Sequence, residues 1–219
     1  MKRCLILAEG QTEERFVKDC LAPHLAKYSV IAVPTIVTTR RVGAGKNRKG
    51  GNQYRRVRDD LLRLLGDSDA VAVTTLIDYY GLPDDFPGMS DRPAGNPGQR
   101  VAHVEHALAN DIDHPTFIPH LTLHEFEAWL YCDWDTCAWV FEEYGADALE
   151  PLRQVSRQFS SPEDINEDRA TAPSRRILAA LPGYQKTLHG PMAVEVIGLD
   201  QVRAQCPHFN AWLEKLEAL

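Results

Sequence analysis

Acidic residues follow the apolar runs of this chain at the points where the runs end. Glu9 follows residues 3–8, Asp78 follows residues 71–77, and Glu125 and Glu127 follow residues 116–123. Ligands of an open α/β sheet bind at the carboxyl ends of its strands, so these side chains are expected to share one edge. The simpler alternative is that each acid only caps a helix or ends a strand.

Several carboxylates at one edge repel one another unless a cation neutralises them. Mg²⁺ or Mn²⁺ suits such a place, because it takes carboxylate and water oxygens and leaves positions for phosphate. We therefore predict that Glu9 and Asp78, with Glu125 or Glu127, hold one or two divalent metal ions.

Strands and helices alternate in the first two thirds of the chain. The predicted strands cover residues 3–8, 31–38, 70–77 and 116–123, and Pro34 favours an edge position for the second. The predicted helices cover residues 12–27, 54–65, 99–109, 124–131 and 134–144. This order predicts an α/β fold with a mostly parallel central sheet and helices on both faces.

The last third reads as helical, with breaks at Pro162, Pro173, Pro182 and Pro191. We expect an α/β domain over residues 1–145 and a helical C-terminal extension, residues 146–219, packed on the same domain. Residues 43–52 and 81–98 are rich in glycine, lysine or proline and are predicted to be mobile loops with few apolar anchors, flanking the site.

Basic residues gather in one stretch although the net charge is −7. Between positions 40 and 58 there are eight, with no acid among them: Arg40, Arg41, Lys46, Arg48, Lys49, Arg55, Arg56 and Arg58. Such an asymmetry predicts a local patch that binds a nucleic-acid backbone, or alternatively an acidic partner protein. A second phosphate site is predicted at a helix start formed by Ser174, Arg175 and Arg176, with Ser174 as its cap.

The candidate catalytic residues are Glu9, Glu13, His124 and Lys186, of which Lys186 is alternatively a plain surface lysine. His124 adjoins Glu125 and is a candidate general base or hydrogen-bond partner of a metal-bound carboxylate, while Lys186 is placed to balance phosphate charge. His103 and His106 have a spacing that zinc can use, but no thiolate or further histidine lies at supportive spacing, so structural or solvated roles are expected.

The remaining composition excludes several classes of protein. No apolar run approaches a membrane span, and the N-terminus lacks the features of a signal peptide, so a cytoplasmic protein is expected. The five cysteines form no CxxC pair and are expected to be reduced and buried, and the four tryptophans are expected in the core. A Walker loop and a Gly-x-Ser-x-Gly elbow are both absent from the sequence, which argues against NTPase and acyl-transfer activity.

Five segments together resemble the Toprim-like bacterial family called domain of unknown function 4276. They are residues 9–13 (EGQTE), 78–83 (DYYGLP), 124–130 (HEFEAWL), 172–176 (APSRR) and 206–213 (CPHFNAWL). The strand ending at Glu9-Gly10 and the strand ending at Asp78 resemble the Toprim module of topoisomerases, primases and some nucleases. The resemblance implies a Toprim/Rossmann-like fold, general acid or base chemistry at Glu9, and a role in phage defence beside an ATPase partner.

The chain departs from the full Toprim pattern at one position. That pattern has a second acid two residues after the first, and here the position is Tyr80. Glu125 or Glu127 is expected to replace it, or Asp84 and Asp85 from the following loop. The favoured function is a Mg²⁺- or Mn²⁺-dependent nuclease acting on DNA or RNA. The alternatives are a non-catalytic regulatory subunit with a degenerate metal site, and phosphotransfer on a small nucleotide.

Overall fold

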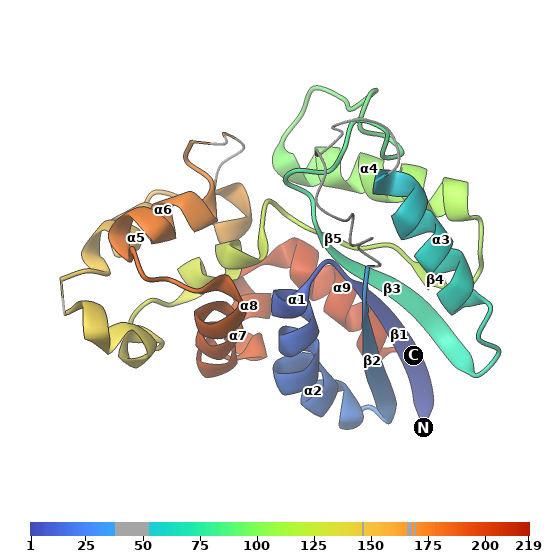
Figure 1. Ribbon diagram of the computed structural model, residues 1–219, viewed down its shortest axis with the longest axis horizontal. Helices are drawn as coiled ribbons and strands as arrows, with labels where there is room; N and C mark the ends of the chain where they lie inside the picture. Colours follow the sequence, from blue (N-terminus) through green and yellow to red (C-terminus); the bar gives the residue numbers. More distant parts are fainter. Residues whose placement is uncertain (38–52, 146, 166–167, 169) are drawn as a thin grey trace, which may run out of the picture.

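A parallel sheet forms the centre of the protein (Figure 1). The structure, a computed structural model, describes residues 1–37, 53–145, 147–165, 168 and 170–219. The strands are β1 (Lys2–Ala8), β2 (Val30–Ile36), β3 (Ala70–Asp78), β4 (Phe117–Ile118) and β5 (Leu121–Thr122). Their order is β2-β1-β3-β4, with β5 also on β3, and every described pair is parallel. The predicted mostly parallel α/β architecture is confirmed.

Nine α-helices and four helical segments of other types lie in the described residues. The α-helices are α1 (Gln11–Phe16), α2 (Ala22–Ala26), α3 (Gln53–Leu65), α4 (Pro97–Ile112), α5 (Glu150–Ser156), α6 (Pro173–Ala180), α7 (Lys186–Ile197), α8 (Leu199–Gln205) and α9 (Pro207–Glu217). A π turn, Val17–Leu21, joins α1 to α2, and 3₁₀ segments cover Phe126–Cys132, Ala138–Tyr144 and Pro162–Asp164. The segments 124–131 and 134–144, predicted as helical, are therefore largely 3₁₀.

Both faces of the sheet are covered. Along β1, Cys4 and Ile6 enter one hydrophobic cluster, and Leu5 and Leu7 enter another on the opposite face, because side chains of a strand alternate. Figure 1 shows α3 and α4 on one side of the sheet and α1, α2 and α9 on the other, with α5, α6 and α7 forming a lobe beside it. β2 lies at the edge of the sheet, as Pro34 predicted.

The predicted strand 116–123 is interrupted. β4 ends at Ile118 and β5 begins at Leu121. Between them, Pro119 has no N–H to donate to a neighbouring strand, and the backbone of His120 bonds to a side chain of β3 rather than to its backbone. Thr75 Oγ1 donates to the carbonyl of His120 at 2.6 Å and accepts from its N–H at 3.0 Å. The interruption fixes His120 beside β3.

Pro191 does not break the last third of the chain as predicted, because it lies inside α7. A proline at this position leaves the carbonyl of Thr187, four residues earlier, without its helical donor. Arg15 Nη1 lies 3.4 Å from that carbonyl oxygen and supplies a replacement donor. The other three prolines lie at element boundaries: Pro162 and Pro173 begin helical segments, and Pro182 follows α6.

The segment after β3 has an apolar anchor that its composition did not predict. Phe86 is 2% exposed, and its ring packs against Tyr54 of α3 with 5.0 Å between centroids. Residues 43–52, predicted as a mobile loop, lie outside the described residues, as do Arg40, Arg41 and Lys46. All five cysteines are buried and free, as predicted. Among the helices of the described residues, none has both the length and the apolar character that crossing a membrane requires.

Candidate functional site

Three carboxylates link the strand ends through backbone hydrogen bonds. Glu9, directly after β1, accepts a hydrogen bond from the N–H of Asp78 at the end of β3 (2.8 Å). Asp78 in turn accepts from the N–H of Phe126, after β5 (2.9 Å). Glu125 accepts from the N–H of Ser174 at the start of α6 (2.9 Å). The structure thus brings Glu9, Asp78 and Glu125 into one hydrogen-bonded chain at the carboxyl edge of the sheet.

Glu127 and Lys186 form the deepest ion pair at this edge. The Glu127 side chain is 1% exposed, and its Oε2 lies 3.2 Å from Nζ of Lys186, at the start of α7. Its other oxygen lies 3.5 Å from the hydroxyl of Tyr184. Burial and the neighbouring Glu127 carboxylate raise the pKa of Tyr184 well above its ordinary value, so the hydroxyl stays protonated and donates. Tyr184 is a site residue that no local sequence pattern predicted.

Loss of hydration and mutual repulsion raise the pKa values of Glu9, Asp78 and Glu127. Loss of hydration, followed by the charges of Glu9 and Glu13, raises the pKa of Asp78 well above its ordinary value. Partial desolvation also raises the pKa of Glu9, and burial raises that of Glu127, even though Lys186 lowers both. Burial lowers the pKa of Lys186, but the glutamates Glu127 and Glu125 outweigh it and raise the value overall. The excess of negative charge would be relieved by a cation.

Glu13 lies at the same edge, one turn into α1. Its Oε2 accepts from the N–H of Gly10 at 2.8 Å, which caps the start of the helix. Burial, followed by repulsion from Glu9 and Glu127, raises the pKa of Glu13 to about 7, with hydrogen bonds opposing the shift. A carboxyl that titrates near neutral pH can both take and give a proton.

We predict that Glu13→Gln stabilises the metal-free protein at pH 8 and not at pH 4. The pKa of Glu13 is about 7 in the folded state and 4.5 ordinarily. Between these two pH values the folded protein binds more protons than the unfolded chain, so the free energy of unfolding falls as pH rises. Glutamine keeps an acceptor for Gly10 but never ionises. Urea unfolding in the presence of a chelator should show a gain on the order of 3 kcal/mol at pH 8.

The control for this prediction is Glu14→Gln, which removes the carboxylate of the next residue. Oε1 of Glu14 lies 2.7 Å from Nζ of Lys18 at the surface. That surface change should alter the unfolding free energy by less than about 1 kcal/mol at either pH. Equal stability of wild type and Glu13→Gln at pH 8 would show that folding does not raise the pKa of Glu13.

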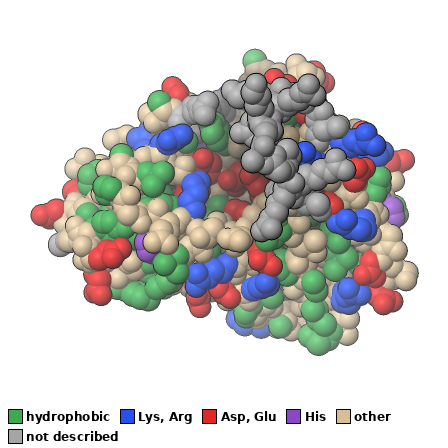
Figure 2. Space-filling view, viewed as in Figure 1, with side chains coloured by type: hydrophobic (Ala, Val, Ile, Leu, Met, Phe, Trp, Pro, Cys, Tyr) green, Lys and Arg blue, Asp and Glu red, His purple; other side chains and the backbone are tan. Residues whose placement is uncertain are grey.

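The acids line a hollow in the surface. Figure 2 shows acidic side chains at the floor of a depression near the middle of this face, with basic side chains beside it. A pocket at the edge is lined by Glu9 and Asp78, by Tyr80, and by Tyr54 and Arg56 of α3. An arginine and two carboxylates therefore face the same space, which is the charge pattern expected for a phosphate held beside a cation.

The sheet-edge acids have the right ligand atoms for a divalent metal ion, but their donor atoms are not close enough together to bind one ion as they stand. Their oxygen donors and their repulsion suit a divalent cation. In no group of three sheet-edge carboxylates among the described residues do the donor atoms all lie within 4.8 Å of one another. Within the described part of the chain, that spacing is met by a different group of side chains: Glu105, His120 and His208. The sheet-edge acids engage backbone N–H groups and Lys186 instead. To bind one ion, some of their side chains must rotate.

His124 and Tyr80 shape the chain around the acids. The N–H of Tyr80 donates to the carbonyl of His124 at 2.8 Å. His124 adopts the left-handed region, with φ of 65°, an uncommon conformation for a residue with a side chain. Its Nε2 lies 2.9 Å from the carbonyl oxygen of Glu163. The backbone turn at His124 directs the chain from β5 into Glu125.

The predicted phosphate site at α6 has a different arrangement. Ala172, not Ser174, holds the N-cap position, because Pro173 begins the helix one residue earlier. The N–H of Ser174 donates to Glu125, so a protein carboxylate occupies this helix start. Arg176 Nε donates to the carbonyl of Thr171 at 2.7 Å, and Arg175 is exposed.

The basic residues of α3 differ in their partners. Arg58 Nε lies 2.9 Å from Asp111 of α4, and Arg55 lies 3.8 Å from Asp59 with both side chains largely exposed. Arg56 lines the pocket beside Glu9 and Asp78. Of the described basic residues of this stretch, Arg56 is thus the one that the structure places against the sheet-edge acids.

Comparison with known proteins identifies a family but no activity. The family model described as Domain of unknown function (DUF4276) matches residues 8–217, which include every acid of the sheet edge. No protein with curated annotation matches the chain, and no solved structure matches it.

Proposed function

The chain belongs to the family described as Domain of unknown function (DUF4276), and we propose that it is a divalent-metal-dependent phosphodiesterase that cleaves nucleic acid. One observation carries the proposal: Glu9 at the end of β1, Asp78 at the end of β3 and Glu125 after β5 lie at one edge of the sheet, linked through backbone hydrogen bonds. Loss of hydration and repulsion raise the pKa values of Glu9 and Asp78. The Toprim resemblance of the Glu9 and Asp78 segments supports the same reading.

The proposed roles follow from the contacts of each side chain. Glu9 and Asp78, with Glu125 or Glu127, would hold Mg²⁺ or Mn²⁺. When bound, such a cation stabilises charge on a phosphoryl oxygen and makes water more acidic. Glu13, with its pKa of about 7, exchanges a proton near neutral pH, and Glu9 is the alternative group for this step.

Lys186 and the arginines supply positive charge. Lys186 is paired with Glu127, orients that buried carboxylate and opposes the rise of its pKa that burial causes. Arg56 faces the pocket beside Glu9 and Asp78, where it is placed to hold a phosphate of the backbone. A contact of Arg56 with the backbone would not read base edges, which fits a nuclease with little sequence preference. A role in phage defence together with an ATPase partner is part of the proposal through the family resemblance alone.

A second candidate is a non-catalytic regulatory subunit. Two observations favour it: Tyr80 stands in place of an acid, and no three of the described sheet-edge carboxylates have donor atoms within 4.8 Å of one another. In this reading the acids and Lys186 serve only to hold the strand ends to α6 and α7.

A metal titration combined with a nuclease assay separates the two candidates. Binding of Mn²⁺ is measured calorimetrically, and cleavage of single-stranded DNA, duplex DNA and tRNA is followed with Mn²⁺, Mg²⁺ or a chelator. The phosphodiesterase reading requires cation binding and cation-dependent cleavage of at least one substrate. Absence of both, in protein shown to be folded, would leave the regulatory subunit as the better interpretation.

Nucleic-acid affinity is predicted to depend on Arg55 and Arg56 and to weaken with salt. Reversing both charges (Arg55→Glu with Arg56→Glu) should reduce the slope of log affinity against log salt concentration by about 0.7 to 0.9 for each phosphate group that the protein no longer neutralises. Fluorescence anisotropy with a labelled oligonucleotide over a range of salt concentrations measures the slope.

The matched control reverses Lys2, the first residue of β1, and Lys27, which follows α2 and precedes β2; both are exposed at the amino edge of the sheet. The change in net charge is the same, so an equal loss of affinity in the control would mean that only the total charge matters. Unchanged nucleic-acid affinity after reversal at Arg55 and Arg56, with loss of association to a partner protein, would mark this stretch as a protein interface.

A further inference from the structure

We propose that Glu105, His120 and His208 form a second metal site, which takes zinc or a chemically similar transition-metal ion. Glu105 belongs to α4, His120 lies between β4 and β5, and His208 lies in the first turn of α9. Their donor atoms all lie within 4.8 Å of one another. Two imidazoles and a carboxylate are a ligand set that zinc uses, whereas Mg²⁺ prefers oxygen donors, so this site differs in chemistry from the sheet-edge acids.

The distances suit a four-coordinate ion. Glu105 Oε1 lies 2.9 Å from Nε2 of His208 and 3.7 Å from Nδ1 of His120. Ligand bonds of 2.0–2.2 Å in a tetrahedral site place neighbouring donor atoms roughly 3.4 Å apart. The two separations from Glu105 lie on either side of that value, and the two imidazole donors lie within 4.8 Å of each other, so the three donors are close to the spacing that one ion requires.

His120 is held in place before any ion binds. Its backbone N–H and carbonyl are both bonded to Thr75 Oγ1. Its ring stacks on the indole of Trp212, with 4.3 Å between centroids and 8° between planes. Trp212 is fixed in turn, because its Nε1–H donates to Thr74 Oγ1 at 2.9 Å. The imidazole therefore loses little freedom on binding an ion, which favours affinity.

The other two ligands have their own supports. Glu163 accepts hydrogen bonds from the N–H groups of His208 and Phe209, both at 2.9 Å, and so fixes the start of α9. Glu105 Oε1 accepts from the N–H of Leu121 at 2.8 Å, which ties α4 to β5. Groups that orient metal ligands in this way commonly raise metal affinity.

Access to the site is partial. The side chain of His120 is 1% exposed, while those of Glu105 and His208 are 14% and 19% exposed. Three protein ligands with solvent on one side leave room for a water molecule as the fourth ligand, as in sites where zinc is exchangeable or reactive. The metal-free alternative is a hydrogen-bonded pair, in which Glu105 accepts from His208 and His120 only packs beside it.

Metal content and a cobalt spectrum test the proposal. The protein is incubated with Zn²⁺ and dialysed, and its zinc content per chain is measured by elemental mass spectrometry. In a second experiment Co²⁺ replaces Zn²⁺, and its absorption spectrum reports the coordination number. We expect retention of one zinc per chain and an intense four-coordinate Co²⁺ spectrum. Glu105→Gln and His208→Gln should each weaken Zn²⁺ binding by more than the 10- to 100-fold typical of residues that only orient a ligand.

Two control variants make the test specific. His106→Ala removes an exposed histidine from the same helix, and it should bind Zn²⁺ like the wild type. Asp78→Asn alters the sheet edge and should leave both the zinc content and the Co²⁺ spectrum unchanged. Circular dichroism establishes that the Glu105→Gln and His208→Gln proteins are folded.

The proposal is overturned if the wild type retains no zinc, if its Co²⁺ spectrum is that of an ion surrounded by six oxygens, or if folded Glu105→Gln and His208→Gln bind Zn²⁺ as tightly as the wild type. Loss of zinc from Asp78→Asn instead would assign the ion to the sheet edge. Because none of these readouts uses nucleic acid, the proposal stands or falls separately from the phosphodiesterase function.

Discussion

Asp78→Asn is expected to reduce metal-dependent cleavage of nucleic acid by about 1,000-fold or more. The substitution removes the charge of a proposed metal ligand, and loss of about 4 kcal/mol of transition-state stabilisation corresponds to that factor. Asparagine keeps an oxygen that can accept from the N–H of Phe126, so the link between β3 and the segment after β5 is preserved. Initial rates with Mn²⁺ on the best substrate, measured with equal amounts of folded protein, give the factor.

Asp69→Asn is the matched control, because Asp69 is an exposed aspartate just before β3, at the opposite end of that strand. Its activity should equal that of the wild type. Asp84→Asn tests whether the loop after β3 provides a metal ligand, since a loss of activity comparable to that of Asp78→Asn would show that it does. Full activity of Asp78→Asn would remove the sheet edge from the mechanism.

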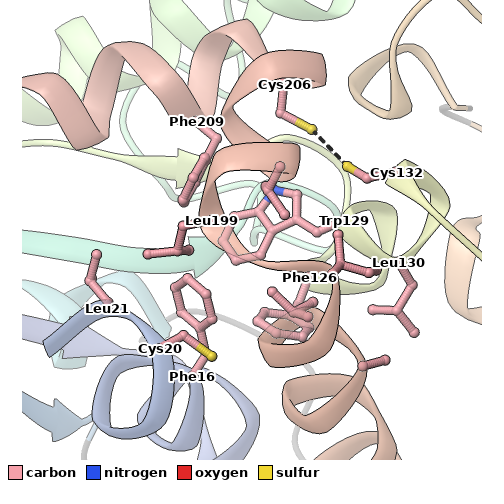
Figure 3. Packing of buried hydrophobic residues seen from close by; sticks show 14 of the residues in the cluster. Phe16, Cys20, Leu21, Phe126, Trp129, Leu130, Cys132, Leu199, Cys206 and Phe209 are labelled. Carbon is pink, nitrogen blue, oxygen red and sulfur yellow. Dashed lines mark hydrogen bonds between the residues drawn. The ribbon is translucent and has the colours of Figure 1, made fainter. Parts of the chain in front are cut away.

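Trp129→Ala is expected to lower the free energy of unfolding by about 3–5 kcal/mol. Trp129 is 1% exposed and lies among Phe16 of α1, Phe126 and Phe209 of α9, with ring centroids 4.8–5.0 Å away (Figure 3). Its loss leaves a cavity where three elements meet, directly after Glu125 and Glu127 in the chain. Urea unfolding at one pH measures the change.

Trp139→Ala provides the comparison, because Trp139 is 54% exposed. The prediction that all four tryptophans lie in the core is wrong at this one. Removing it should change the unfolding free energy by no more than about 0.5 kcal/mol. Similar losses for the two substitutions would mean that Trp129 does not join α1 and α9 as its contacts indicate.

The sequence by itself determined the central sheet and the edge at which its acids emerge. An apolar run with acid at its end predicts a buried strand, and in a parallel sheet every strand ends at the same edge. Glu9 and Asp78 therefore had to emerge at one edge once β1 and β3 were recognised. The edge position of β2 followed equally from Pro34, because a proline cannot donate to a second neighbour.

Only the tertiary structure decided which distant groups meet these acids. Glu125 receives the N–H of Ser174, and Glu127 pairs with Lys186, across 49 and 59 residues of sequence. Glu105, His120 and His208 are separated by 15 and 88 residues, so no local spacing signals their cluster.

The physical reason is that periodicity and capping act within one or two turns, whereas these contacts depend on how α4, α6, α7 and α9 pack around the sheet. The same limit explains Pro191, whose place inside α7 is accommodated by Arg15 from α1, a partner 172 residues away from the carbonyl it serves. Local chemistry places the acids at the edge of a sheet, and long-range packing selects the cations, donors and imidazoles that surround them.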